Sequence, residues 1–174
     1  MDTQIKIISI LRKLSLILFL ATLYSCTKEE KFPAEPAIEY LSFTKIQNST
    51  AIDDKGFLKI SFTDGDGDMG LSESDTMSPY DKSSIFYYNF FITYYEKQHG
   101  QFVKVTPSVT FNSRIPVLTP SGNNNSLKGE ISIELFINNP LSDYDTIKFD
   151  ASIADRALHI SNTITTPEII VKKQ

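Results

Sequence analysis

Apolar and polar residues alternate with a period of two over much of this chain, from residue 37 to near the C-terminus. Successive side chains of a β-strand point to opposite faces, so this period predicts strands with one buried face. No segment of this region has the 3.6-residue period of an amphipathic helix. The alternation therefore predicts an all-β fold.

Turn residues divide the alternating region into short strands. We predict strands over residues 38–46, 56–63, 85–95, 101–106, 109–118, 130–135, 145–154 and 164–171. Pro116 and Pro167 lie within two of these segments, and proline is confined mainly to edge strands because it cannot donate to the ladder. Seven to eight short strands separated by turns predict an immunoglobulin-like antiparallel β-sandwich.

Residues 1–25 have the features of a lipoprotein signal peptide. Lys6, Arg12 and Lys13 provide a positive start, and residues 14–23 form a short apolar run. A spanning helix needs about 20 apolar residues, so this run is too short to cross a bilayer. Residues 23–26, Leu-Tyr-Ser-Cys, resemble a bacterial lipobox, and Cys26 is the only cysteine. We therefore expect cleavage before Cys26 and lipidation of Cys26.

Cleavage would leave one domain tethered to a membrane. Several acyl chains on one residue give stable anchoring. We interpret residues 26–36 as a flexible tether and residues 37–174 as the β-sandwich domain. A single cysteine allows no intramolecular disulfide. Without residues 1–25 the chain has 14 basic and 20 acidic residues, a net charge of −6, which argues against nucleic acid as a partner.

A dense acidic loop follows the segment 56–63. Asp64, Asp66 and Asp68 alternate with Gly65 and Gly67. Ca²⁺ takes six to eight oxygen ligands, and glycine lets the backbone fold tightly enough for alternate side chains to converge. Asp-Gly pairs are also ordinary turn formers. Three unpaired carboxylates repel one another, however, so the loop favours a calcium site over a plain acidic turn.

The phases of two strands predict a fourth acidic ligand. Residues 58, 60 and 62 are predicted to point into the core, and the next residue in this alternation is Asp64. Residues 149, 151 and 153 are likewise predicted to point inward, and the next residue in their alternation is Asp155. In an immunoglobulin-like sandwich these two central strands would lie in opposite sheets and run toward the same end. Two converging carboxylates need a cation or a base. The sequence leaves two candidates, a bound Ca²⁺ and a salt bridge from Arg156.

Residues 62–70, Phe-Thr-Asp-Gly-Asp-Gly-Asp-Met-Gly, and residues 155–163, Asp-Arg-Ala-Leu-His-Ile-Ser-Asn-Thr, resemble motifs of small surface lipoproteins of Bacteroidota with immunoglobulin- or cadherin-like domains. Residues 26–30, Cys-Thr-Lys-Glu-Glu, resemble the signal that directs some of these lipoproteins to the outer face of the outer membrane. The resemblance implies a fold and a cell-surface location but no activity. An EF-hand does not fit, because Met69 occupies the position of its invariant glycine.

No catalytic motif accompanies these features, so we do not expect an enzyme. In the predicted strand 85–95, the odd-numbered residues would point away from the core and include Tyr87, Phe91 and Tyr95. So many aromatic residues are unusual on a solvent-facing side of a strand. Exposed aromatic side chains suit a glycan, a peptide or a protein partner. Burial of this face under residues 107–118 is the competing interpretation. The sequence thus predicts a surface binding module, with a structural envelope component as the alternative.

Overall fold

The computed structural model describes residues 12, 13, 15, 31–119 and 125–173. The chain divides into two compact units, residues 1–30 and residues 31–174. Within the described residues, no helix is both long and apolar enough to span a bilayer. Cys26 and all but three residues of the predicted signal peptide lie outside the described part, so lipidation stays a prediction.

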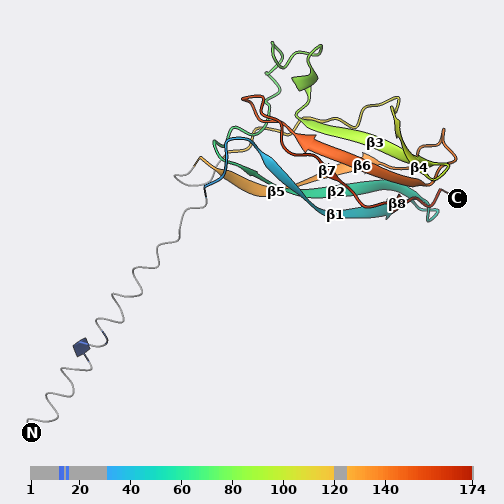
Figure 1. The fold of residues 1–174 in the computed structure, drawn as a ribbon, viewed down its shortest axis with the longest axis horizontal. Helices are drawn as coiled ribbons and strands as arrows, with labels where there is room; N and C mark the ends of the chain where they lie inside the picture. Colours follow the sequence, from blue (N-terminus) through green and yellow to red (C-terminus); the bar gives the residue numbers. More distant parts are fainter. Residues whose placement is uncertain (1–11, 14, 16–30, 120–124, 174) are drawn as a thin grey trace, which may run out of the picture. The chain divides into compact units, whose positions relative to one another are not determined.

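The second unit is an antiparallel β-sandwich. Its elements are β1 (Ala37–Gln47), β2 (Asp53–Asp64), a 3₁₀ turn (Ile85–Tyr87), β3 (Phe90–Gln98), β4 (Gln101–Val105), β5 (Leu127–Phe136), β6 (Thr146–Ile153), β7 (Ile164–Thr165) and β8 (Ile169–Ile170). One sheet has the order β1-β2-β5, and the other has the order β4-β3-β6-β7, with β8 also pairing with β6. Figure 1 shows the two sheets as separate layers. The predicted all-β, immunoglobulin-like sandwich is confirmed.

The core lies between the facing sides of β2 and β6. In β2, Leu58, Ile60 and Phe62 are buried, and the residues between them are half-buried on the other face. Strand β6 repeats this pattern with Phe149, Ala151 and Ile153. Full burial of a large apolar side chain stabilises a fold by about 1.5–3 kcal/mol, so these alternating positions hold the two sheets together.

One glycine in β2 makes room for a ring that crosses the core. A Cβ atom at position 56 would lie 2.2 Å from the ring of Phe43, so the close approach of this ring requires Gly56. The ring of Phe43 stacks on that of Phe149, with 5.9 Å between the centroids. Phe43 belongs to β1 and Phe149 to β6, so this pair links the two sheets.

The predicted strand over residues 85–95 begins later than expected. Ser84 accepts a hydrogen bond from the amide of Phe86, and residues 85–87 form the 3₁₀ turn instead of a strand. Strand β3 starts only at Phe90. The prediction was therefore wrong for its first half, because a local cap competes with the extended conformation there.

The predicted strand over residues 109–118 is also wrong, because only a single bridge between Ser113 and Phe90 forms there. Side-chain amides replace the missing ladder. The Asn89 side chain accepts from the amide of Ile115 at 2.6 Å, and the Asn112 side chain accepts from the amide of Ile92 at 2.8 Å. This segment is therefore fixed to the sheet without becoming a strand.

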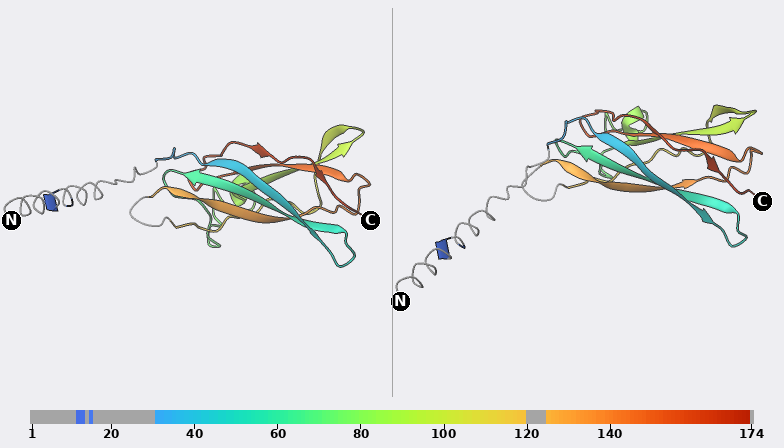
Figure 2. Two further views of the ribbon diagram at one scale, coloured as in Figure 1. Left: turned by 90° about the horizontal axis from the view of Figure 1, so that it is seen from below. Right: turned by 60° about the horizontal axis from the view of Figure 1, so that its bottom comes forward.

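The two central strands run in the same direction. The arrows of β2 and β6 point toward the end of the sandwich where residues 31–36 lie (Figures 1 and 2). We call this end the tether end, and we call the end that carries Asp53 and Gln98 the far end. Asp64 and Asp155, at or just beyond the ends of these strands, thus reach the same end.

The far end contains a buried carboxylate with a complete set of donors. Glu96 is 2% exposed. Its Oε1 accepts from Tyr94 and Asn139 at 3.0 and 2.9 Å, and its Oε2 accepts from Ser142 and Gln98 at 2.7 and 3.4 Å. Burial raises the pKa of Glu96, but these hydrogen bonds outweigh burial and leave the pKa below its ordinary value. The carboxylate is thus held in its charged form.

We expect Glu96→Gln to lower the free energy of unfolding by about 1–3 kcal/mol at pH 7, because an amide NH₂ would face donors. A pKa lowered by folding adds stability above the unfolded pKa, and that stability is lost as the pH falls through the folded pKa. Urea unfolding of both proteins should therefore give a smaller difference at pH 3 than at pH 7. Glu130 forms an exposed ion pair with Lys59, so Glu130→Gln is the matched control. An equal loss at both pH values would contradict this assignment.

Candidate metal centre

Strand β2 delivers the first acidic side chain to the tether end. Asp64 is the last residue of β2 and continues the inward phase of Leu58, Ile60 and Phe62. It is 0% exposed. Neither carboxylate oxygen of Asp64 has a hydrogen-bond partner among the described residues. The orientation predicted from the strand phase is confirmed, and the carboxylate is buried without a donor.

The turn after β6 delivers the second acidic side chain. Asp155 is 2% exposed and lies two residues beyond the end of β6. Its Oδ1 accepts from the amide of His159 at 2.8 Å, and its Oδ2 contacts His159 Nδ1 at 2.8 Å. Leu158 has a positive φ of 72° in this turn. The hydrogen bond from the His159 ring to the Asp155 carboxylate raises the pKa of His159. His159 therefore orients the Asp155 carboxylate.

The loop after β2 adds two more carboxylates. Asp66 is exposed and Asp68 is half-buried. Gly67, between them, has a φ of 73°, a conformation that favours glycine. Oδ1 of Asp68 is buried and has no hydrogen-bond partner among the described residues. The glycine turn thus directs alternate side chains of the loop toward Asp64, as the spacing predicted.

The four carboxylates converge. Asp64, Asp66, Asp68 and Asp155 each offer one oxygen, and these oxygens lie within 4.8 Å of one another. Oxygen ligands of one ion can be separated by at most twice the metal–oxygen distance, which is about 4.6–5.2 Å for Ca²⁺. The cluster could therefore hold a single metal ion between the two sheets.

The electrostatics of the cluster oppose its full ionisation in the absence of a cation. Burial, followed by the neighbouring charge of Asp66, raises the pKa of Asp64 to about 7. Burial and the charge of Asp155 likewise raise the pKa of Asp68. The carboxylates thus destabilise one another's charged forms at a place where solvent screens them poorly. A bound cation would lower the pKa of both Asp64 and Asp68.

Arg156, the alternative neutralising group, is directed elsewhere. Its guanidinium donates to both oxygens of Asp75, at 2.5 and 3.2 Å. This ion pair holds the pKa of Asp75 below its ordinary value. The amide of Arg156 donates to the backbone carbonyl of Asp68 at 3.3 Å. Arg156 therefore fastens the two loops of the cluster together without forming a salt bridge to Asp64 or Asp155.

Sequence reasoning missed two contributors to the site. The role of Asp75 carried no local signal, because its partner Arg156 lies 81 positions away. The contact of Gly65 with the end of the tether was also missed. A Cβ atom at position 65 would lie 2.2 Å from the carbonyl oxygen of Phe32. Both contacts depend on the fold, which brings distant segments together.

The predicted ligand face is divided between two elements. Phe91 and Tyr95 lie half-buried on the outward face of β3. Tyr87 lies in the 3₁₀ turn, outside β3, with Arg114 over its ring at 5.3 Å. Lys148 lies over the ring of Tyr95, 5.1 Å from its centroid. Tyr87 therefore does not share a strand face with the other two residues, and ligand binding by this face remains a prediction.

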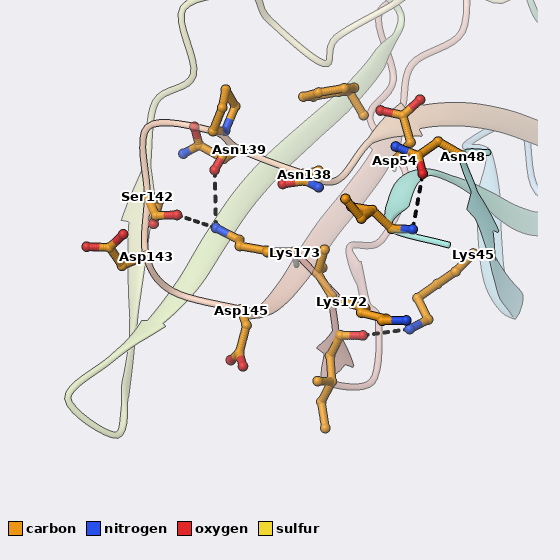
Figure 3. Close-up of a pocket in the computed structure, with 15 residues that line it drawn as sticks. Lys45, Asn48, Asp54, Asn138, Asn139, Ser142, Asp143, Asp145, Lys172 and Lys173 are labelled. Atoms are coloured by element: carbon orange, nitrogen blue, oxygen red, sulfur yellow. Dashed lines mark hydrogen bonds between the residues drawn. The ribbon is translucent and has the colours of Figure 1, made fainter. Parts of the chain in front are cut away.

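A polar hollow of about 980 Å³ lies at the far end (Figure 3). Two of the lysines that line it, Lys45 and Lys173, stabilise the fold. Lys173 donates to the carbonyl oxygens of Asn139 and Ser142, and Lys45 donates to the carbonyl oxygen of Ile170 and pairs with Asp53. These bonds fasten the C-terminal segment to its neighbours. Asp54, Asp143 and Asp145 balance the charge of the hollow, and we assign it no ligand.

Comparison of the chain with protein families, with curated proteins and with solved structures finds no match. The functional argument therefore depends on the residues of the cluster.

Proposed function

We propose that this chain is a lipid-anchored protein of the bacterial cell surface whose immunoglobulin-like domain binds Ca²⁺ at its tether end. The ion would be held by Asp64, Asp66, Asp68 and Asp155. Its role would be structural, because it would neutralise carboxylates that come from both sheets of the sandwich. No catalytic step is part of this proposal.

The observation that supports a cation most strongly is the Asp64 carboxylate, which is fully buried and has no donor among the described residues. Other buried acids of the domain differ. Asp53 is 0% exposed, yet it accepts from Lys45, Gln47 and the amide of Lys172. A buried charge without a partner costs several kcal/mol. That Asp64, unlike Asp53, has no donor therefore supports a cation as its partner.

The donor set supports Ca²⁺ over other common metals. All four candidate side chains are carboxylates, the hard oxygen ligands that Ca²⁺ prefers. Zinc sites use mainly cysteine and histidine, and neither residue type is among the four candidate ligands. Mg²⁺ requires a tight octahedron and keeps several waters, so it makes less use of a carboxylate cluster.

The anchor is proposed from the sequence. The short apolar run, the residues Leu-Tyr-Ser-Cys and the single cysteine support acylation of Cys26. Extracellular calcium modules bind at about 10⁻⁴–10⁻³ M, a range that suits a protein on the outer surface of a cell. Location and metal identity thus support each other.

We expect 5 mM Ca²⁺ to raise the free energy of unfolding by about 1.4 kcal/mol over EDTA, if Kd is roughly 0.5 mM. For a domain of this size that is a rise in Tm of roughly 3–5 °C. Mg²⁺ should raise Tm less. Differential scanning calorimetry of the wild type and of Asp66→Asn, which removes an exposed ligand, measures the effect.

Asp143→Asn is the matched control, because it makes the same chemical change in an exposed far-end residue. It should keep the full Ca²⁺ response, whereas Asp66→Asn should lose most of it. Identical melting curves of the wild type in EDTA and in Ca²⁺ would contradict the proposed function.

Cys26→Ser should prevent acylation, because serine cannot form the thioether that carries the diacylglycerol group. We expect this variant to remain uncleaved and to leave the lipoprotein fraction when cells are extracted with detergent. Thr27→Ser, which keeps the cysteine, should behave like the wild type. Normal partitioning of Cys26→Ser with membrane lipoproteins would end the assignment of the anchor.

A further inference from the structure

The end of the tether lies directly against the acidic loop. A Cβ atom on Gly65 would be 2.2 Å from the carbonyl oxygen of Phe32 and 2.4 Å from that of Pro33. Contacts this short leave no room for a side chain, so the tether backbone passes over Gly65. Gly65 is the residue between Asp64 and Asp66, two of the candidate ligands. The tether therefore contacts the acidic loop that carries these candidate ligands.

A second contact fixes the start of β1, which directly follows the tether, to the other ligand-bearing loop. Asn162 follows the turn that carries Asp155, and its side chain accepts from the amide of Ile38 and donates to the carbonyl of Ile38, both at 2.9 Å. Ile38 is the second residue of β1. A surface hollow of about 490 Å³ separates the tether from this loop, and its lining includes Pro33, Glu35, His159 and Ile160.

The tether and the first residues of β1 thus contact loops that follow strands of different sheets. Asp64 comes from β2 of one sheet, and Asp155 follows β6 of the other. Repulsion among the four carboxylates pushes these loops apart, and a divalent cation draws them together. The surface under residues 32–38 is complete only when both loops are in place. Any ion that stabilises the loops must therefore stabilise the docked tether, and the coupling is reciprocal.

We propose that Ca²⁺ at the acidic cluster fastens residues 32–36 to the domain and that loss of the ion releases them. This inference depends on the proposed function and adds a role for the ion. Residues 32–36 would then move with the domain while the ion is bound.

Proteolysis at the Lys31–Phe32 bond measures the docking. The mature chain in detergent is treated with lysyl endopeptidase, which needs no Ca²⁺, and mass spectrometry follows the fragment that begins at Phe32. A protease needs several residues in an extended, accessible form, so docking of residues 32–36 protects the bond. We expect cleavage about tenfold slower in 5 mM Ca²⁺ than in EDTA. Asp66→Asn should be cleaved at the fast rate in both solutions.

Gly65→Ala separates docking from metal binding. The added methyl group meets the backbone of Phe32 and Pro33 and displaces the tether. Gly67 has a positive φ but Gly65 does not, so alanine at position 65 is compatible with the loop backbone and leaves all four carboxylates. This variant should keep its Ca²⁺-induced rise in Tm and lose the protection. A wild type that Ca²⁺ stabilises, with an unchanged cleavage rate, overturns this inference and leaves the proposed function intact. A wild type that Ca²⁺ does not stabilise overturns both.

Discussion

The repulsion among four carboxylates at one end of the sandwich is the constraint on which this structure depends. Asp64 is completely buried, and its two oxygens have no hydrogen-bond partner in the described part of the chain. At the opposite end, the buried carboxylates of Asp53 and Glu96 each accept several hydrogen bonds. The same fold thus satisfies its buried acids at one end with its own donors and leaves an acid unsatisfied at the other. A bound cation would explain this difference, because it would supply at the tether end what lysine, amide and hydroxyl donors supply at the far end.

The cluster also brings together two loops that no covalent cross-link connects. The sequence has one cysteine and therefore no internal disulfide. The core packs the sheets face to face, but Asp64 and Asp155 come from strands of opposite sheets, so one ion between them would close the sandwich at its end. The ion pair of Arg156 with Asp75 adds a second connection beside the cluster. Metal, core and ion pair would then act together where the tether meets the domain.

The strand period and phase were sufficient to predict the fold class and the convergence of Asp64 with Asp155, because both follow from side chains alternating along a strand. The start of β3 and the form of residues 109–118 could not be predicted in this way. There the side chains of Ser84, Asn89 and Asn112 replace backbone pairing, and strand propensity does not describe such replacements. The contact of Gly65 with Phe32 was equally hidden, since it depends on where the tether passes in space. The local pattern thus identified the converging carboxylates, and only the fold revealed what lies against them.

The stability of Asp64→Asn at pH 8, with and without Ca²⁺, tests the central claim most directly. The substitution keeps the shape of the side chain and removes the buried charge that the protein leaves unpaired. The account predicts that Asp64→Asn unfolds at a higher denaturant concentration than the wild type in EDTA. In 5 mM Ca²⁺ the order should reverse, because only the wild type gains a full ligand set. A variant less stable than the wild type by the same amount in both solutions would show that the protein itself satisfies this carboxylate, and would contradict the account.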